Sequence, residues 1–476
     1  MRNYTAAACA VAIVVALSAS CAGIPAADRG LPGAASGKPV PQELTKAEKE
    51  RMELDAIYRA IEAGEYESAE TRLASLASSA PDNRSYPVLR ASVLLSMGRL
   101  GDARAVLAAE LAAFPDNAEA LFALAELERF DGHPEAHRAA IEALVAKYPG
   151  NADAQAALGD IHYEGKNYRK AEEAFAASLS AAPDNVEALL GLARVKYRRE
   201  DTKAALELLD RAVAVAPGDA IAYLDRSRAL YQLGRYAECE ADLDAAVRLA
   251  PESSWNYLER GRLYLDTGRG EQALADFSES IRLVPDYFLP YVYRGSIYES
   301  MGNDAAGLDD YRTVSKLYPD YWYSLESEAV LAYRLGRWDE AFAAFDKASG
   351  YTRAHPEYFV AAALSLFRSG DAKAAKEYAG KTLAKINREK YPLQWLALRL
   401  LYDQGEMTSE LEIGIGAEKS LDVKAGLLFY LGSYWVGKGK MDLGSKYIRM
   451  SYDSERIGTI ERRMAEADLA RLAALK

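Results

Sequence analysis

Residues 254–287 read SWNYLERGRLYLDTGRGEQALADFSESIRLVPDY. The stretch contains two runs of helix-forming residues that are separated at Gly268 and closed at Pro285. Glycine tolerates the left-handed backbone angles that end a helix, and proline stops the helix that precedes it. The stretch therefore predicts two short helices joined by a tight turn.

The same unit recurs along the chain with a period of 34 residues. The closing prolines are Pro81, Pro115, Pro149, Pro183, Pro217, Pro251, Pro285 and Pro319. The turn glycines are Gly64, Gly98, Gly132, Gly234, Gly268, Gly302, Gly336 and Gly370, with Glu200 in place of one of them. Small residues follow five places after the turn, at Ala69, Ala103, Ala171, Ala205, Cys239, Ala273, Gly307, Ala341 and Ala375. A fixed period of this length indicates an array of helical hairpins in which each unit packs on its neighbours.

Polar residues after the prolines predict where the helices begin. Thr45 with Glu48 has the spacing of a capping box that starts the first helix. Asp116 with Glu119, and Asp184 with Glu187, have the same spacing. We therefore expect the Asp or Ser that follows a proline to cap the next helix through its side-chain oxygen.

The pattern resembles the tetratricopeptide repeat family. In residues 254–287 the family's signature places hold Tyr257, Gly261, Tyr264, Gly268, Ala273, Phe277 and Pro285. The resemblance implies an all-α, right-handed superhelical solenoid of about 11–12 hairpins with a C-terminal capping helix. We place ten 34-residue units in residues 45–389, degenerate units in residues 390–458 and the capping helix in residues 459–476.

The N-terminus reads as a targeting segment. Arg2 precedes an apolar run, Ala6 to Leu17, that is too short to span a bilayer. Residues 17–21, LSASC, resemble a bacterial lipobox in which leucine stands one place further from the cysteine than usual, a looseness known from spirochaetes. We expect a lipoprotein signal in residues 1–20, a lipidated Cys21, and a flexible proline- and glycine-rich tether in residues 21–44.

This interpretation predicts a lipid-anchored protein of the cell envelope, in the outer membrane and facing either the periplasm or the surface. The alternative is an ordinary cleaved signal with an incidental cysteine. Removal of Cys9 with the signal and lipidation of Cys21 would leave Cys239 alone, so no internal disulfide is predicted. Cys239 stands at a small-residue place, where a packed and inert thiol is expected.

Charge and histidine content argue against several functions. The net charge is −12 and no basic block is present, which disfavours nucleic-acid binding. His133 and His137 have helical i, i+4 spacing, but Pro134 lies between them and no third ligand is near, so a solvated turn is predicted in place of a metal site. No catalytic residues, metal or cofactor are predicted.

One recurring charge pattern predicts structural ion pairs. Arginines repeat with the period of the array, and each is followed 16 residues later by an aspartate. The pairs are Arg226 with Asp242, Arg260 with Asp276, and Arg294 with Asp310. Matched periodicity in both partners favours a ladder between helices, although these arginines could instead face a ligand.

The resemblance also implies a concave groove, lined by the second, fifth, ninth and twelfth places of each unit's first helix. Ninth places hold Arg194, Arg228 and Arg262, twelfth places Tyr163, Tyr197 and Tyr231, and second places Trp255 and Tyr323. Residues 220–355 contain 22 aromatic residues in 136, against 11 in 174 for residues 46–219. The excess is explained mainly by the core, with a remainder for a binding face.

These residues predict a groove for a protein or peptide partner, and the arginines suit an acidic one. The alternative is that the arginines pair with Glu187, Asp225 or Glu259. The chain as a whole is interpreted as a non-enzymatic scaffold for protein–protein interactions. A surface adhesin that binds host cells is the alternative, a cell-wall enzyme or glycan-binding accessory lacks supporting residues, and the oligomeric state is left open.

Overall fold

The computed structural model describes residues 45–352, 354–454 and 459–475. Within these ranges it contains 25 α-helices and one short 3₁₀ helix, with no β-strand, so the predicted all-α solenoid of helical hairpins is confirmed. The signal segment, Cys21 and the tether lie outside the described residues. No helix of the described part is both long and apolar enough to cross a bilayer.

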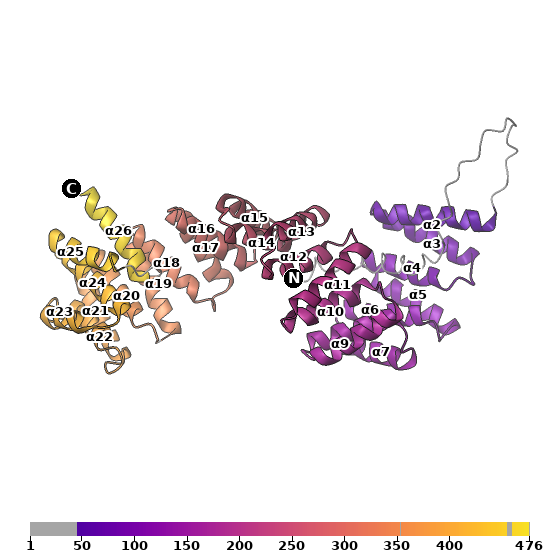
Figure 1. Cartoon of the computed structure of the whole chain (residues 1–476), viewed down its shortest axis with the longest axis horizontal. Coiled ribbons are helices and arrows are strands. Elements are labelled where there is room, and N and C mark those ends of the chain that lie inside the picture. Colours follow the sequence, from indigo (N-terminus) through magenta and orange to yellow (C-terminus); the bar gives the residue numbers. More distant parts are fainter. Residues whose placement is uncertain (1–44, 353, 455–458, 476) are drawn as a thin grey trace, which may run out of the picture. The chain divides into compact units, whose positions relative to one another are not determined.

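The chain divides into two compact units, Met1–Arg235 and Tyr236–Lys476. The described part of unit 1 is a stack of short helices, shown from indigo to magenta in Figure 1. These helices are α2 (Lys46–Glu62), α3 (Tyr66–Ser79), α4 (Ser85–Ser96), α5 (Leu100–Ala113), α6 (Ala118–Phe130), α7 (Pro134–Lys147), α8 (Ala152–Glu164), α9 (Tyr168–Ala181), α10 (Val186–Arg198), α11 (Thr202–Val215) and α12 (Ala220–Gln232). Even-numbered members are the first helices of the predicted repeats.

Unit 2 continues the alternation of helices. Its helices are α13 (Tyr236–Leu249), α14 (Ser254–Asp266), α15 (Gly270–Leu283), α16 (Phe288–Ser300), α17 (Asp304–Leu317), α18 (Tyr323–Arg334), α19 (Trp338–Tyr351), α20 (Glu357–Arg368), α21 (Ala372–Thr382), η1 (Leu383–Lys385), α22 (Pro392–Tyr402), α23 (Thr408–Ala417), α24 (Leu421–Gly437), α25 (Met441–Tyr452) and α26 (Ile460–Ala474). A hydrophobic core runs through its C-terminal part from Leu308 to Leu472.

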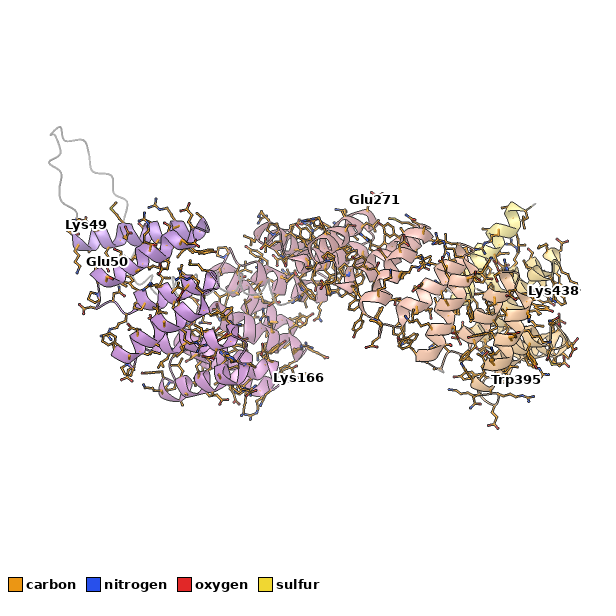
Figure 2. All side chains as sticks on the ribbon, turned by 180° about the vertical axis from the view of Figure 1, so that it is seen from behind. Lys49, Glu50, Lys166, Glu271, Trp395 and Lys438 are labelled. Atoms are coloured by element: carbon orange, nitrogen blue, oxygen red, sulfur yellow. The ribbon has the colours of Figure 1, made fainter. Side chains whose placement is uncertain are left out.

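The turns inside the hairpins are left-handed, as the glycine period predicts. Gly64, Gly98 and Gly132 have φ angles of 72–82°. Two turns of unit 1 keep this conformation without glycine, because Lys166 and Glu200 have φ angles of 57° and 64°. Figure 2 labels Lys166 among the side chains on the outside of its unit.

The small residues that follow each turn by five places are buried. Ala69, Ala103 and Ala171 have no exposed surface, and Cys239 has 2%. The glycines of the first helices have a matching role. A Cβ atom on Gly159 or Gly191 would lie 2.5 or 2.2 Å from the ring of Phe175, so this ring fills the space that both glycines leave open.

The helix caps differ in part from the prediction. The capping box of Thr45 and Glu48 is confirmed. The prediction for Asp116 and Asp184 is wrong, because the caps are Asn117 and Asn185, whose side-chain oxygens accept from Ala120 N and Ala188 N. These asparagines have the extended backbone that an N-cap requires, one residue further along the turn.

Candidate partner-binding surfaces

The first helices of unit 1 enclose a cavity of about 340 Å³. It is lined by Tyr163, Ala193, Arg194, Tyr197, Arg198, Leu209, Asp225 and Arg228. The helices α8, α10 and α12 supply all of these residues except Leu209 of α11. Four predicted groove residues of this unit, Tyr163, Arg194, Tyr197 and Arg228, therefore meet at one place. Tyr231 is half-buried in the last turn of α12 and is not among the lining residues.

One buried carboxylate organises the cavity. Asp225 accepts a hydrogen bond from Arg194 Nε at 2.7 Å and another from Arg228 Nη1 at 2.9 Å. The structure therefore contains the ion pairs with Asp225 that the sequence analysis gave as the alternative to partner binding. Both guanidinium groups still reach the surface, since the side chains of Arg194 and Arg228 are 38% and 34% exposed and that of Asp225 only 7%. Asp225 thus contacts two arginines, and Arg198 adds a third positive charge to the lining of the cavity.

Arg198 was not predicted as a site residue. Its Nε lies 3.5 Å from the hydroxyl of Tyr163, and it borders the cavity one residue after Tyr197. The sequence signal that would have found it is the basic last turn of α10, which also carries Lys196. Positive side chains near a helix C-terminus also interact favourably with the helix dipole.

Arg194 and Arg228 hold the ninth places of successive first helices, and the residues at these places become acidic toward the N-terminus of the unit. Its earlier members at the same 34-residue spacing are Glu126 and Asp160. Burial raises the pKa of Asp160 to about 6, and the charge of Arg194 opposes this rise. Burial likewise raises the pKa of Glu187 at a second place, and the charges of Asp153 and Asp219 add to the rise. The charge of the groove residues in unit 1 therefore changes from negative to positive along the groove. The residue types at the 34-residue spacing would have predicted this change.

Unit 2 presents a run of stacked rings in place of arginines. Trp255 stacks on Tyr287 with ring centroids 6.0 Å apart, and Phe288 stacks on Tyr318 at 4.7 Å. The run continues through Tyr321, Tyr323 and Trp322. The predicted residues Trp255 and Tyr323 lie in this run and are 40% and 58% exposed.

The third arginine of the predicted ladder, Arg262, also lies in unit 2. Its Nη1 donates to Glu259 Oε2 at 2.9 Å, so the predicted alternative of a local pair is present here too. Its guanidinium lies 6.0 Å from the centroid of the Tyr293 ring. Arg262 belongs to a different unit from Arg194 and Arg228, and the ladder across the two units stays a prediction.

Two of the predicted ion pairs are formed within unit 2. Arg260 donates to both oxygens of Asp276 at 2.8 Å, and Arg294 donates to those of Asp310 at 2.7 and 2.9 Å. Asp276 and Asp310 are buried, and these forked contacts leave neither carboxylate uncompensated. The pairing matches the structural interpretation of these arginines.

Each of these arginines also contacts a group 16 residues earlier, which the sequence interpretation missed. Arg260 Nη1 donates to Asp244 at 2.8 Å, and Arg294 Nη1 donates to Ser278 at 3.1 Å. In unit 1, Arg226 Nη1 donates to Asp210 at 3.0 Å. The predicted partner of Arg226, Asp242, belongs to unit 2, and that pair stays a prediction.

The two histidines do not form a metal site. His133 is exposed, with Nδ1 3.1 Å from Glu128. The prediction of a solvated turn is wrong for His137, which is buried with Nδ1 2.9 Å from the carbonyl oxygen of Ala125. The hairpin buries this ring because it stands at the place that other repeats give to a small residue. The described residues contain no group of three or more side chains arranged to hold a metal ion.

Cys239 is buried, and burial raises the pKa of its thiol to about 12. A thiol reacts through its thiolate, so this cysteine is poorly suited to chemistry at neutral pH. The structure therefore agrees with a packed, unreactive role at the small-residue place of the α12–α13 repeat.

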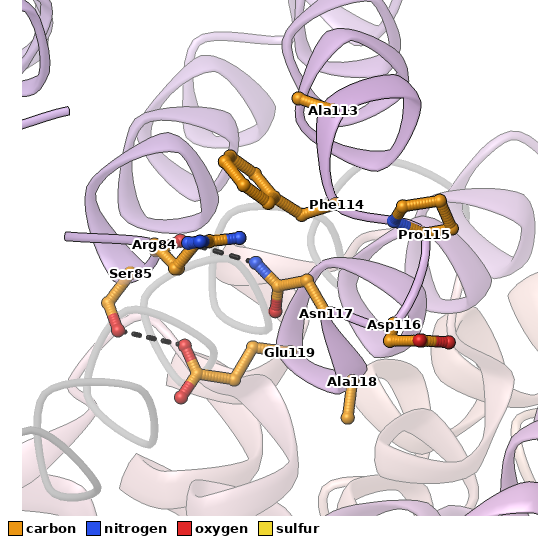
Figure 3. A pocket seen from close by; sticks show the side chains of 9 residues that line it. All are labelled: Arg84, Ser85, Ala113, Phe114, Pro115, Asp116, Asn117, Ala118 and Glu119. Atoms are coloured by element: carbon orange, nitrogen blue, oxygen red, sulfur yellow. Dashed lines mark hydrogen bonds between the residues drawn. The ribbon is translucent and has the colours of Figure 1, made fainter. Parts of the chain in front are cut away.

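A larger hollow, of about 550 Å³, lies at the Pro115 turn between α5 and α6 (Figure 3). Its polar groups join neighbouring hairpins: Ser85 Oγ donates to Glu119 at 3.0 Å, and Asn117 Nδ2 approaches the carbonyl oxygen of Arg84 at 3.4 Å. The guanidinium of Arg84 lies 3.0 Å from the centroid of the Phe114 ring. These contacts hold the turn, and we interpret the hollow as structural.

Comparison with protein families places the repeats in a known class. The tetratricopeptide repeat model matches residues 54–118 and 88–132, and a model described as the ETO1 C-terminal domain matches residues 150–333. The chain contains tetratricopeptide repeats. The all-helical solenoid and the regular 34-residue spacing of turns described above are those of this class, whose members generally bind protein or peptide partners.

Several solved structures resemble the chain. One is YrrB, described as a TPR protein with an unusual peptide-binding site, with 15% identity, 40% of this chain and 97% of that chain covered, and a TM-score of 0.34. A tetratricopeptide repeat protein from Parabacteroides merdae has 20% identity, coverage of 52% and 98%, and a TM-score of 0.37. PilF from Pseudomonas aeruginosa has 18% identity, coverage of 46% and 97%, and a TM-score of 0.39. No curated protein matches the sequence, and no function named in these descriptions is assigned to this tetratricopeptide repeat chain.

Proposed function

We propose that this tetratricopeptide repeat protein is a non-enzymatic scaffold that holds an acidic peptide segment of a partner protein in the groove of unit 1. The observation that carries the proposal is the cavity in which Arg194, Tyr197 and Arg228 meet. Their side chains come from two successive first helices, so the cavity is produced by the stacking of repeats and is not an isolated hollow.

The chemistry of the cavity favours a carboxylate. Arg194 and Arg228 share Asp225 and, together with Arg198, line the cavity with three guanidinium groups. A guanidinium can fork onto a carboxylate, and each fork fixes the orientation of the bound group. Tyr163 and Tyr197 add apolar area at low entropic cost. An extended acidic segment, or a chain terminus, satisfies these groups together.

Reversal of the two charges tests this proposal. In full-length protein, Arg194→Glu with Arg228→Glu is expected to abolish capture of an acidic partner from envelope extract. Arg169→Glu with Arg211→Glu makes the same charge change on exposed residues outside the cavity and is expected to retain capture. Equal capture by both folded double variants would contradict the proposal. Wild-type capture should weaken with added salt, because exposed charges are screened.

The proposed location is the bacterial envelope, with the scaffold anchored through a lipid on Cys21. The support is the sequence LSASC at residues 17–21 and the proline- and glycine-rich stretch that follows it, and the loosened lipobox suits a spirochaete-type source. Labelled palmitate should enter the wild-type protein and not Cys21→Ala. Equal labelling of the two would contradict the anchor while leaving the groove proposal untouched.

A further inference from the structure

The last helix of unit 2 lies against helices far from it in the sequence. The helix α26 packs on α24 and α25, as the first helix of a further repeat would, but it also packs on α18, the first helix of the fourth hairpin before it (Figure 1). By the repeat register, Glu326 and Tyr333 of α18 hold groove places. The position of α26 is therefore that of a ligand as well as that of a cap.

The N-terminal half of α26 is held by a forked ion pair. Arg463 donates to both carboxylate oxygens of Glu299, at 2.7 and 2.9 Å, across 164 residues of sequence. Arg463 Nη1 also lies 3.7 Å from Glu326 of α18. Glu299 holds the twelfth place of α16 and Glu326 the fifth place of α18, which are groove places by the repeat register.

The C-terminal half of α26 is held by a buried carboxylate. Asp468 is 1% exposed and accepts hydrogen bonds from the Tyr333 hydroxyl at 2.9 Å, from Arg368 at 2.7 Å and from the Ser433 hydroxyl at 3.1 Å. Tyr333 holds the twelfth place of α18. Three helices, α18, α20 and α24, thus contribute one donor each to a single side chain of α26.

A second arginine of α26 closes the end of α18. Arg471 Nη2 donates to the carbonyl oxygens of Tyr333 and Arg334 at 2.6 and 2.5 Å, and its Nη1 donates to Asp468 at 2.6 Å. The last carbonyl groups of a helix lack partners within the helix and carry partial negative charge. A guanidinium placed there satisfies them and positions α26 along α18.

This mode of attachment relies on charges as much as on apolar burial. The apolar residues that α26 buries are Ile460, Met464, Ala465 and Leu472, and with them it buries the carboxylates of Glu461 and Asp468. Desolvation of buried charges offsets much of the attraction between them, so such contacts specify position more than they add stability. The charges of α26 therefore define the pattern that any other helix would need in order to occupy the same face.

We propose that the inner face of α16, α18, α20 and α24 is a second binding site of this chain, with α26 as its resident ligand. Its external ligand is an amphipathic helix that carries arginine, aspartate and arginine at the spacing of Arg463, Asp468 and Arg471, and that enters by displacing α26. The site lies wholly in unit 2 and is independent of the acidic-peptide groove of unit 1.

The test uses the full-length chain and a fluorescein-labelled peptide with the sequence of residues 459–475. Arg463→Ala with Arg471→Ala removes two anchors of α26 and leaves every residue of the groove unchanged. Labelled peptide should bind this variant at least about tenfold more tightly than wild type, because the resident helix no longer competes for the site. Glu466→Ala, an exposed change on the same helix, should bind as weakly as wild type.

A charge exchange shows where the peptide binds. The variant with Arg463→Ala and Arg471→Ala is called the loosened variant. Addition of Glu299→Arg to it should abolish binding of the native peptide. A peptide that carries Arg463→Glu should restore binding. Equal binding to wild type and the folded loosened variant would overturn the proposal, as would a peptide insensitive to Glu299→Arg. A stable dimer of the loosened variant that exchanges α26 between copies would also overturn it.

Hydrogen exchange on the wild-type protein provides a measurement that requires no variant. If α26 leaves the groove while the repeats remain folded, its amide groups should exchange at least about tenfold faster than those of α18 and α24. Equal protection of the three helices would show that α26 is released only by global unfolding, and the proposal would then be wrong.

Discussion

Lys166 and Glu200 adopt backbone angles that most repeats of this chain reserve for glycine. Their φ values of 57° and 64° fall in the left-handed region, where a Cβ atom is unfavourable by roughly 1–2 kcal/mol. Both side chains are exposed. The packing of the hairpin therefore sets the left-handed turn, and the turn forms even where the residue is not glycine.

Replacement of these two residues by glycine should stabilise unit 1. We expect Lys166→Gly and Glu200→Gly each to raise the free energy of unfolding by about 0.5–1 kcal/mol, since relief of strain exceeds the added entropy of the unfolded chain. Thermal unfolding followed by circular dichroism measures the effect. The reverse change, Gly268→Ala at φ 76°, should cost about 1 kcal/mol, and no change in either direction would contradict this account.

The forked pair of Arg260 and Asp276 predicts an asymmetry between single and double variants. Asp276→Leu leaves a guanidinium that is only 18% exposed without its main partner and should cost about 2–3 kcal/mol. Arg260→Met with Asp276→Leu should cost less than the single change, because no buried charge remains. Chemical denaturation of the three proteins tests this, and a double variant that is less stable than Asp276→Leu would refute it.

At the scale of the element, two neighbouring hairpins of unit 1, α8–α9 and α10–α11, pack around one aromatic ring. Phe175 of α9 is fully buried and lies over Gly159 of α8 and Gly191 of α10. A Cβ atom on Gly191 would lie 2.2 Å from the ring, far inside van der Waals contact. The spacing between these three helices therefore depends on the two glycines.

Gly191→Ala should destabilise unit 1 by about 1–3 kcal/mol, because an added methyl group forces the ring or the helix to move. Gly218→Ala, at a turn with open space and an ordinary φ angle, is the matched control and should change stability by less than about 0.5 kcal/mol. Phe175→Leu in the Gly191→Ala background should recover part of the loss. Equal melting temperatures for Gly191→Ala and Gly218→Ala would contradict the packing argument.

At the scale of the molecule, long-range polar contacts attach α26 to the rest of unit 2. Glu461 is buried beside the Tyr430 hydroxyl, which donates to it at 2.8 Å. Burial raises its pKa to about 7, and the charges of Glu357 and Glu326 add to the rise. Arg463 on the same helix lies 3.7 Å from Glu326, and His355 lies 2.7 Å from Glu357. Both side chains therefore act on carboxylates whose charges raise the pKa of Glu461.

Docking of α26 should therefore weaken as the pH rises. A carboxyl whose pKa is raised in the folded state adds stability that is fully present below its ordinary value of 4.5 and is lost as the pH passes about 7. We expect Glu461→Gln to stabilise the protein by about 1–3 kcal/mol at pH 8 relative to its effect at pH 5. Melting curves at both pH values test this. His355→Gln controls for the nearby imidazole, and a pH-independent effect of Glu461→Gln would contradict the prediction.

The 34-residue period by itself determined the repeating hairpins, their left-handed turns, the buried small residues and the Arg260–Asp276 and Arg294–Asp310 pairs. These features are contacts within a hairpin or between successive hairpins, so they recur in sequence wherever they recur in space. The groove residues of unit 1 also follow from the period, which brings Arg194 and Arg228 together. Their shared use of Asp225 was foreseen only as one of two alternatives.

Only the tertiary structure decided the return of α26 to α16 and α18. Arg463 and Glu299 are 164 residues apart, and no repeat spacing relates them. Their contact depends on the small rotation between successive hairpins, summed over several repeats. The local sequence determines each hairpin and its contact with the next one. The total rotation over several repeats depends instead on the packing of all the hairpins together.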